Sequence, residues 1–143
     1  MYNIVEVANK IQRYYSSQEP VMPVYKEDYI EFVLRALEKY YVDRNHPEEY
    51  DESLYCYNDK EELCYDFDFN VVQKEYILIL AQLIFKRYEM SDVTGDAAMS
   101  YTTNALSVTG AKEGYKSIQQ EINDLENERI RVFHKLMVND TEG

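Results

Sequence analysis

The apolar stretch from Val71 to Tyr88 constrains this chain more than any other feature of its sequence. Its hydrophobic residues recur at steps of three and four, and others fill the sides between them, so a helix here is apolar over most of its circumference. Such a helix lies inside a protein rather than on its surface. Several polar or charged residues argue against a membrane span: Gln73, Lys74, Glu75, Gln82, Lys86 and Arg87. The stretch therefore predicts a buried core helix.

Both ends of this predicted helix carry recognisable signals. Asn70 is a good N-cap residue, and Gln73 follows three residues later, at the spacing of a capping box. Lys86 and Arg87 fall in the last turn, where positive charge suits the unpaired carbonyl groups. We therefore expect the helix to begin directly after Asn70 and to end near Tyr88.

Three other stretches have the periodicity of amphipathic helices, and four glycines with three prolines are few for a strand-rich fold. The first stretch follows Asn3, and a break at residues 16–23 separates it from a second at about Lys26 to Val42. The last is expected at about Ala111 to Val138, with one charged position in its apolar seam: Tyr115, Ile118, Ile122, Leu125, Arg129, Val132 and Leu136. The predicted fold class is all-α, a bundle of about four helices in one domain covering residues 1–143.

A long insertion at residues 43–70 separates the second helix from the core helix and mixes aromatic residues with carboxylates. From Glu48 to Asp68 it holds nine acidic residues and one lysine. Cys64 to Phe69 alternates as a strand does, but acids occupy alternate positions, so we expect at most a short strand or an irregular arm.

The insertion contains two patterns that could hold a metal, and both are incomplete. Asp66, Asp68 and Asn70 have the spacing that begins a calcium loop, but Val71 replaces the required glycine and the closing glutamate is missing. Cys56 and Cys64 lie eight positions apart without a CxxC motif, which is too few ligands for zinc. We expect no metal or cofactor. A single disulfide between the cysteines stays open, although free thiols are the favoured interpretation.

The segment at residues 91–114 is rich in small and hydroxylated residues, which disfavour a helix. Leu106 alternates with Val108 as in a strand, so we expect an extended loop or a small hairpin before the last helix. Loops of this length in compact domains are usually functional or disordered. An apolar edge of two residues predicts that another surface covers it, with Tyr101 and Asn104 adding hydrogen bonds there.

The net charge of −12 argues against binding to nucleic acid through clusters of Lys and Arg. It favours solubility, or an acidic surface that repels or imitates DNA. No apolar run follows charged residues at the N-terminus, so we expect synthesis in a cytoplasm without a signal peptide. His46 and His134 have no neighbouring nucleophile signature, and no phosphate-binding glycine loop is present. The chain is predicted not to be an enzyme.

The second half of the chain resembles the head-tail connector (adaptor) proteins of tailed bacteriophages. The resemblance is carried by a core helix ending in Lys86-Arg87-Tyr88-Glu89, the stretch from Tyr101 to Gly110, and Gly114-Tyr115 at the start of a charged helix. The amino-terminal half, with its helix after residues 24–29, resembles the family less distinctly. The insertion at residues 43–70 is longer than the family pattern needs.

This resemblance implies a small helical adaptor that forms a ring of about twelve copies beneath the portal. Its expected partners are other copies of itself, the portal protein and a tail or stopper protein, and DNA would pass through the ring without specific binding. The expected place is the neck of the virion, with no membrane contact. The segment at residues 91–114 would reach a neighbour, and the expected partner-binding residues are Tyr101, Asn104, Leu106 and Val108.

An acidic regulatory binding protein is the alternative function. Such a protein would imitate DNA or inhibit a basic host protein by occupying its positively charged site. The two functions differ in assembly, because a mimic stays a monomer or dimer whereas an adaptor builds a large ring.

We predict that a chelator leaves the melting temperature of the protein unchanged. The incomplete calcium pattern at Asp66, Asp68 and Asn70 provides no reason for a structural metal. Differential scanning fluorimetry with and without EDTA tests this, and a fall of several degrees would show that a metal stabilises the fold.

Overall fold

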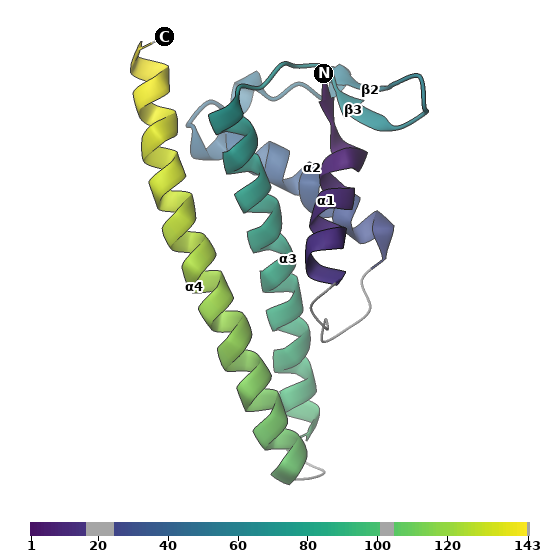
Figure 1. The fold of residues 1–143 in the computed structure, drawn as a ribbon, viewed down its shortest axis with the longest axis vertical. Coiled ribbons are helices and arrows are strands. Elements are labelled where there is room, and N and C mark those ends of the chain that lie inside the picture. The colour runs from purple at the N-terminus through teal and green to yellow at the C-terminus, as the bar shows by residue number, and fades with distance from the viewer. Residues whose placement is uncertain (17–24, 101–104, 143) are drawn as a thin grey trace.

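The computed structural model describes residues 1–16, 25–100 and 105–142, with side chains described at residues 1–16, 25–91 and 116–138. Four α-helices and three short strands make up most of this part of the chain (Figure 1). In chain order they are β1 Tyr2–Asn3, α1 Ile4–Ser16, α2 Lys26–Asp43, β2 Tyr55–Tyr57, β3 Leu63–Tyr65, α3 Val71–Ser100 and α4 Ala105–Glu142. Two 3-10 helices, Pro47–Glu49 and Glu52–Leu54, precede β2. The prediction of a helical bundle is confirmed.

The start of α3 is fixed by the predicted capping box. The Asn70 side-chain oxygen accepts a hydrogen bond from the Gln73 backbone N–H, and the Gln73 side-chain oxygen accepts one from the Asn70 N–H, both at 2.8 Å. These two bonds satisfy donors that the first helical turn leaves unpaired. The helix therefore begins at Val71 as expected.

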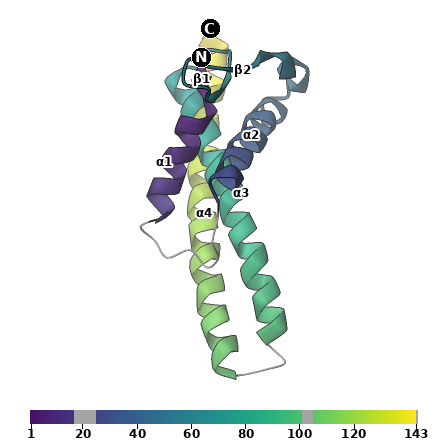
Figure 2. The ribbon, with the colours of Figure 1, turned by 90° about the vertical axis from the view of Figure 1, so that its right-hand side faces the viewer.

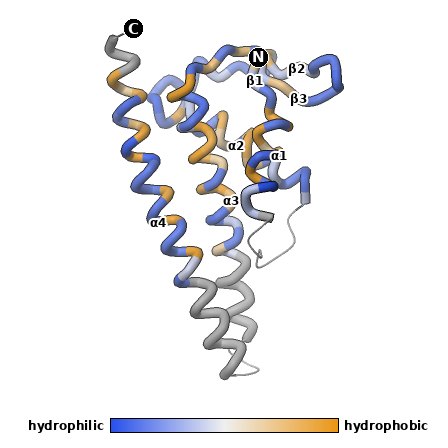
Figure 3. Tube along the Cα trace, viewed as in Figure 1, coloured by the Kyte–Doolittle hydropathy of each residue, from blue (hydrophilic) through white to orange (hydrophobic). Residues whose placement is uncertain are grey.

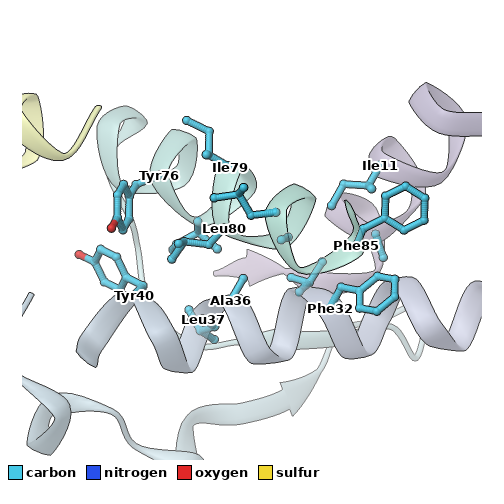
Figure 4. Close-up of a cluster of buried hydrophobic side chains, with 14 of the residues drawn as sticks. Ile11, Phe32, Ala36, Leu37, Tyr40, Tyr76, Ile79, Leu80 and Phe85 are labelled. Carbon is cyan, nitrogen blue, oxygen red and sulfur yellow. The ribbon is translucent and has the colours of Figure 1, made fainter. Parts of the chain in front are cut away.

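The core lies where α2 packs against the first half of α3, with α1 beside them and α4 on the other side of α3 (Figures 1 and 2). Figure 3 shows hydrophobic residues gathered there, while the β2–β3 turn and much of α4 are hydrophilic. Figure 4 shows side chains from α2 and α3 pointing toward each other; the fully buried ones among them include Ala36, Leu37, Tyr40, Tyr76, Leu80 and Phe85. The predicted core helix is thus buried as expected.

The small sheet ties the acidic insertion to the N-terminus. Its strand order is β1-β3-β2 and both pairs are antiparallel, with Tyr2 opposite Tyr65 and Cys56 opposite Cys64. Tyr65 is fully buried and its ring stacks on Phe69 with centroids 6.1 Å apart. The short strand expected within Cys64 to Phe69 is present as β3, although it ends at Tyr65, and β2 was not predicted. The insertion also contributes aromatic residues to the core.

The predicted extended loop or hairpin at residues 91–114 is wrong. Helix α3 continues to Ser100 and α4 begins at Ala105, so Leu106 and Val108 lie in a helix. Unfavourable residues such as Thr94 cost a helix less than about 1 kcal/mol each, and extending a formed helix adds one hydrogen bond per residue. Two alternating hydrophobic residues are also too few to distinguish a strand from a helix. The hairpin of this fold is β2–β3 instead.

The last part of α3 and the first part of α4 run past the ends of α1 and α2 (Figures 1 and 2). The last ring contact between α3 and α2 joins Tyr88 to Phe32, with centroids 5.6 Å apart. Beyond it, residues 91–100 and 105–115 form a two-helix projection that we call the hairpin arm. Among the residues that the structure describes, no helix has the length and hydrophobicity to cross a membrane.

We predict that Leu80→Ala lowers the free energy of unfolding by about 2–5 kcal/mol, because Leu80 is fully buried. Val71→Ala is a matched control on the same helix, since Val71 is 79% exposed and should change stability by less than about 0.5 kcal/mol. Chemical denaturation measures both. Equal stabilities of the two variants would mean that the core is not centred on this helix.

Candidate functional site

A buried lysine lies where α1, α3 and α4 meet. The Lys86 ammonium is 3.1 Å from a Glu89 carboxylate oxygen and 2.5 Å from Glu121 of α4. The side chains of Lys86 and Glu89 are each only 5% exposed. The ammonium also lies 4.5 Å from the centre of the Tyr15 ring of α1, within cation–π distance. One positive charge therefore contacts side chains from three helices.

A second cluster of polar side chains joins α2, α3 and α4 elsewhere in the bundle. The Tyr76 hydroxyl donates a hydrogen bond of 2.7 Å to Asp43, and the Arg129 guanidinium lies 3.5 Å from that hydroxyl. Arg129 also donates to Glu126 at 2.9 Å, and Glu126 accepts from Arg87 of α3. The charged position in the seam of α4 is thus satisfied by polar partners.

A pocket opens beside the buried lysine. Its volume is about 360 Å³, and α1, α3 and α4 all contribute to its wall. The lining combines two tyrosines and two carboxylates with an amide and an apolar residue: Tyr14, Tyr15, Gln82, Glu121, Asp124 and Leu125. We call it the acidic pocket. Burial raises the pKa of the Tyr15 hydroxyl above its usual range, and the Glu121 carboxylate adds to this shift, so Tyr15 stays neutral.

A second hollow of about 310 Å³ lies between α2 and the sheet. Apolar and aromatic residues line it together with charged ones: Glu31, Leu34, Arg35, Glu38, Tyr50, Tyr55 and Leu63. The Tyr50 and Tyr55 hydroxyls share a hydrogen bond of 2.8 Å, and Arg35 pairs with Glu31 at 3.1 Å. This hollow offers contact area with few unpaired polar groups.

Neither hollow contains a histidine. His46 lies in the exposed turn after α2, with Nδ1 3.2 Å from Glu48, and His134 is exposed on α4. Among the described residues, no group of three His, Cys, Asp or Glu side chains could hold a metal ion. In the acidic pocket Glu121 is already paired with Lys86, so Asp124 and the tyrosine rings are the groups that suit the binding of a cation through charge and ring contacts.

Of the four predicted partner-binding residues, Tyr101 and Asn104 lie outside the described residues. Leu106 and Val108 belong to the hairpin arm as part of α4, and their side chains lie outside the described ones. Their role stays a prediction. Sequence reasoning missed both the acidic pocket and the buried Lys86 with its partners. Only the lysine had a usable signal in the sequence, which is Glu89 three residues later in an apolar helix.

Comparisons with protein-family models, with curated proteins and with solved structures found no match to this chain. The resemblance to connector proteins is therefore carried by the sequence pattern alone.

We predict that Lys86→Met destabilises the protein by about 3–5 kcal/mol, because it leaves the buried Glu89 carboxylate without its counter-charge. The double variant Lys86→Met with Glu89→Gln should recover a large part of this loss, since it removes the uncompensated charge as well. Urea unfolding of the parent and both variants measures the effect. If the single variant is as stable as the parent, the lysine does not organise this junction.

We predict that the fold becomes unstable at alkaline pH. Burial raises the pKa values of Tyr15 and Tyr76 above the usual range. Unfolded tyrosine ionises near pH 10, so this stabilisation is present below about pH 10 and is lost as the pH rises toward the folded-state pKa values. Phenolate absorbance should rise together with loss of helical circular dichroism, and Tyr15→Phe should reduce the pH dependence. Full tyrosine ionisation with the helices intact would contradict this.

Proposed function

We propose that this protein is a head-tail adaptor of a tailed bacteriophage. In this proposal it forms a ring of about twelve copies, docks beneath the portal, and provides a landing surface for a tail or stopper protein. DNA passes through the ring. The protein is made in the host cytoplasm and ends in the neck of the virion, and it performs no catalysis.

The hairpin arm is the single observation that carries this proposal. A helix pair that runs past the rest of the bundle can pack against a neighbouring copy or the portal without disturbing the core (Figures 1 and 2). Its base is held by the buried Lys86 cluster, so the arm leaves the body in a defined direction. A subunit that must repeat one contact around a ring needs such a defined direction.

The acidic insertion gives the proposal further support. Of the nine carboxylates between Glu48 and Asp68, all except Glu62 are exposed, and Lys60 is the one basic residue among them. A negatively charged surface repels DNA, which lets a duplex move past without binding. The same surface also favours the alternative, an acidic mimic that occupies the basic site of another protein.

Native mass spectrometry of the purified chain, alone and with a portal ring, tests the proposal. We expect a ring of about twelve copies, either free or formed on the portal. A chain that stays a monomer or dimer with and without the portal would overturn the adaptor and favour the mimic, which should then bind a basic protein.

A pair of variants tests whether the arm makes the contact. We predict that Leu106→Asp with Val108→Asp abolishes ring formation. Residues two positions apart lie on different faces of a helix, so whichever of the two meets a partner would bring an unpaired charge into the buried contact. Helix content should persist, since acidic residues are tolerated in the first turn of α4. Ile130→Asp with His134→Asp is the control, at exposed positions of α4 outside the arm. Normal assembly of the arm variant would exclude these residues from the contact. If the control variant also fails to assemble, the loss of assembly is not specific to the arm, and the arm contact is not supported.

A further inference from the structure

The two cysteines of this chain face each other across the β2–β3 strand pair, whatever the function of the protein. The register places Cys56 directly opposite Cys64, with Tyr55 opposite Tyr65 and Tyr57 opposite Leu63. Residues opposite each other in an antiparallel pair project to the same side of the sheet. Both thiols therefore lie on one face, and both are free in this structure.

The backbone pairing on either side defines the spacing of this cysteine pair. Asn58 N–H donates to the Glu62 carbonyl at 3.1 Å, and Asp66 N–H donates to the Leu54 carbonyl at 2.9 Å. Hydrogen-bonded pairs alternate along an antiparallel ladder, so Cys56 and Cys64 occupy the hydrogen-bonded pair midway between these two. Its Cα atoms are about 5.5 Å apart, a spacing that disulfides span. The Cβ atoms of opposite residues are about 4.5–5.5 Å apart, at the wide end in a hydrogen-bonded pair, and a disulfide needs about 3.8 Å, so closing the bridge draws the two strands together locally.

The two thiols differ in their surroundings. Cys64 is 1% exposed, and its thiol contacts the Glu62 carbonyl at 3.5 Å. Cys56 is partly exposed, and its sulfur lies 3.9 Å from the Met1 sulfur. Burial raises the pKa of the Cys64 thiol, with smaller contributions from Cys56 and Glu62. An external reagent therefore reaches Cys56 first.

We propose that Cys56 and Cys64 are a redox-active dithiol that closes to an intrachain disulfide when it meets a low-molecular-weight disulfide such as oxidised glutathione. The Cys56 thiolate attacks one glutathione sulfur, which forms a mixed disulfide and expels one glutathione thiolate. The Cys64 thiolate then attacks the Cys56 sulfur, which breaks the mixed disulfide and releases the second glutathione. The protein loses two electrons and two protons, and the oxidant becomes two glutathione thiols.

The disulfide would fix the part of the β2–β3 strand pair that faces α2. Tyr55 and Leu63 flank the two cysteines and line the hollow of about 310 Å³ between the sheet and α2. Closing the bridge holds β2 and β3 in this register, so the wall of the hollow becomes rigid. A reducing cytoplasm keeps the pair open, and an oxidising medium closes it.

Intact-mass spectrometry of the purified full chain, incubated with oxidised and then with reduced glutathione, tests the proposal. We expect a monomer that loses two hydrogen atoms and both maleimide-reactive thiols, with peptide mapping that joins residues 56 and 64. The melting temperature should rise by about 5 °C or more on oxidation and return on reduction. Free thiols after prolonged oxidation, or disulfides only between chains, would overturn the proposal.

Two single variants test the order of attack. Cys64→Ser should accumulate a stable glutathione adduct on Cys56, because no second thiol resolves it. Cys56→Ser should acquire little adduct, because the remaining thiol is buried. Equal adduct formation in both variants would contradict the assigned roles. If either variant fails to fold, the intact-mass experiment on the parent chain still shows whether the disulfide forms.

Discussion

The buried charge of Lys86 is the interaction on which the arrangement of the helices depends. An ammonium group that is 5% exposed is tolerated only where opposite charge and hydrogen-bond acceptors compensate for lost hydration. Glu89 supplies one partner from the same helix, Glu121 supplies one from α4, and the Tyr15 ring covers the group from α1. Purely hydrophobic packing would allow α4 to slide by a turn along α3. The lysine favours one register together with the Tyr76–Arg129 and Arg87–Glu126 contacts, and it lies near the point where the hairpin arm begins.

Tyrosine explains how so acidic a chain folds around this junction. Its ring fills core volume while its hydroxyl reaches a polar partner, so one residue type serves both the interior and its edge. In the insertion, the Tyr50 and Tyr65 rings are stacked with an interplanar angle of 7°, whereas acids such as Asp66 and Asp68 face solvent. The Tyr76 hydroxyl likewise connects Asp43 to Arg129. Water and salt screen the mutual repulsion of these carboxylates because they face solvent outside the aromatic core.

Local signals in the sequence predicted the fold well, and tertiary features were predicted poorly. The start of α3 was readable because the Asn70–Gln73 box is a short-range interaction, and the hydrophobic period at about residues 26–42 identified α2 as a helix. The length of α3 was missed because Thr94 and Gly95 weaken a helix only slightly, and such a cost is outweighed once two helices extend side by side. The acidic pocket needs Tyr15, Gln82 and Asp124 from three helices, so no spacing along the chain reveals it. The cysteine pair required the register of β2 and β3.

The acidic insertion lies at one end of the long axis of the molecule, and the end of α3 with the start of α4 lies at the other (Figure 1). This separation bears on the choice between the two proposed functions. A mimic of DNA needs only the acidic end, so mimicry does not account for a long helical arm at the other end. A ring adaptor uses both ends, because the arm can contact a neighbouring subunit while the acidic end faces DNA or another partner. The Lys86 cluster lies between the two ends, so it defines their relative direction. The adaptor proposal therefore accounts for more of the structure than the mimic does.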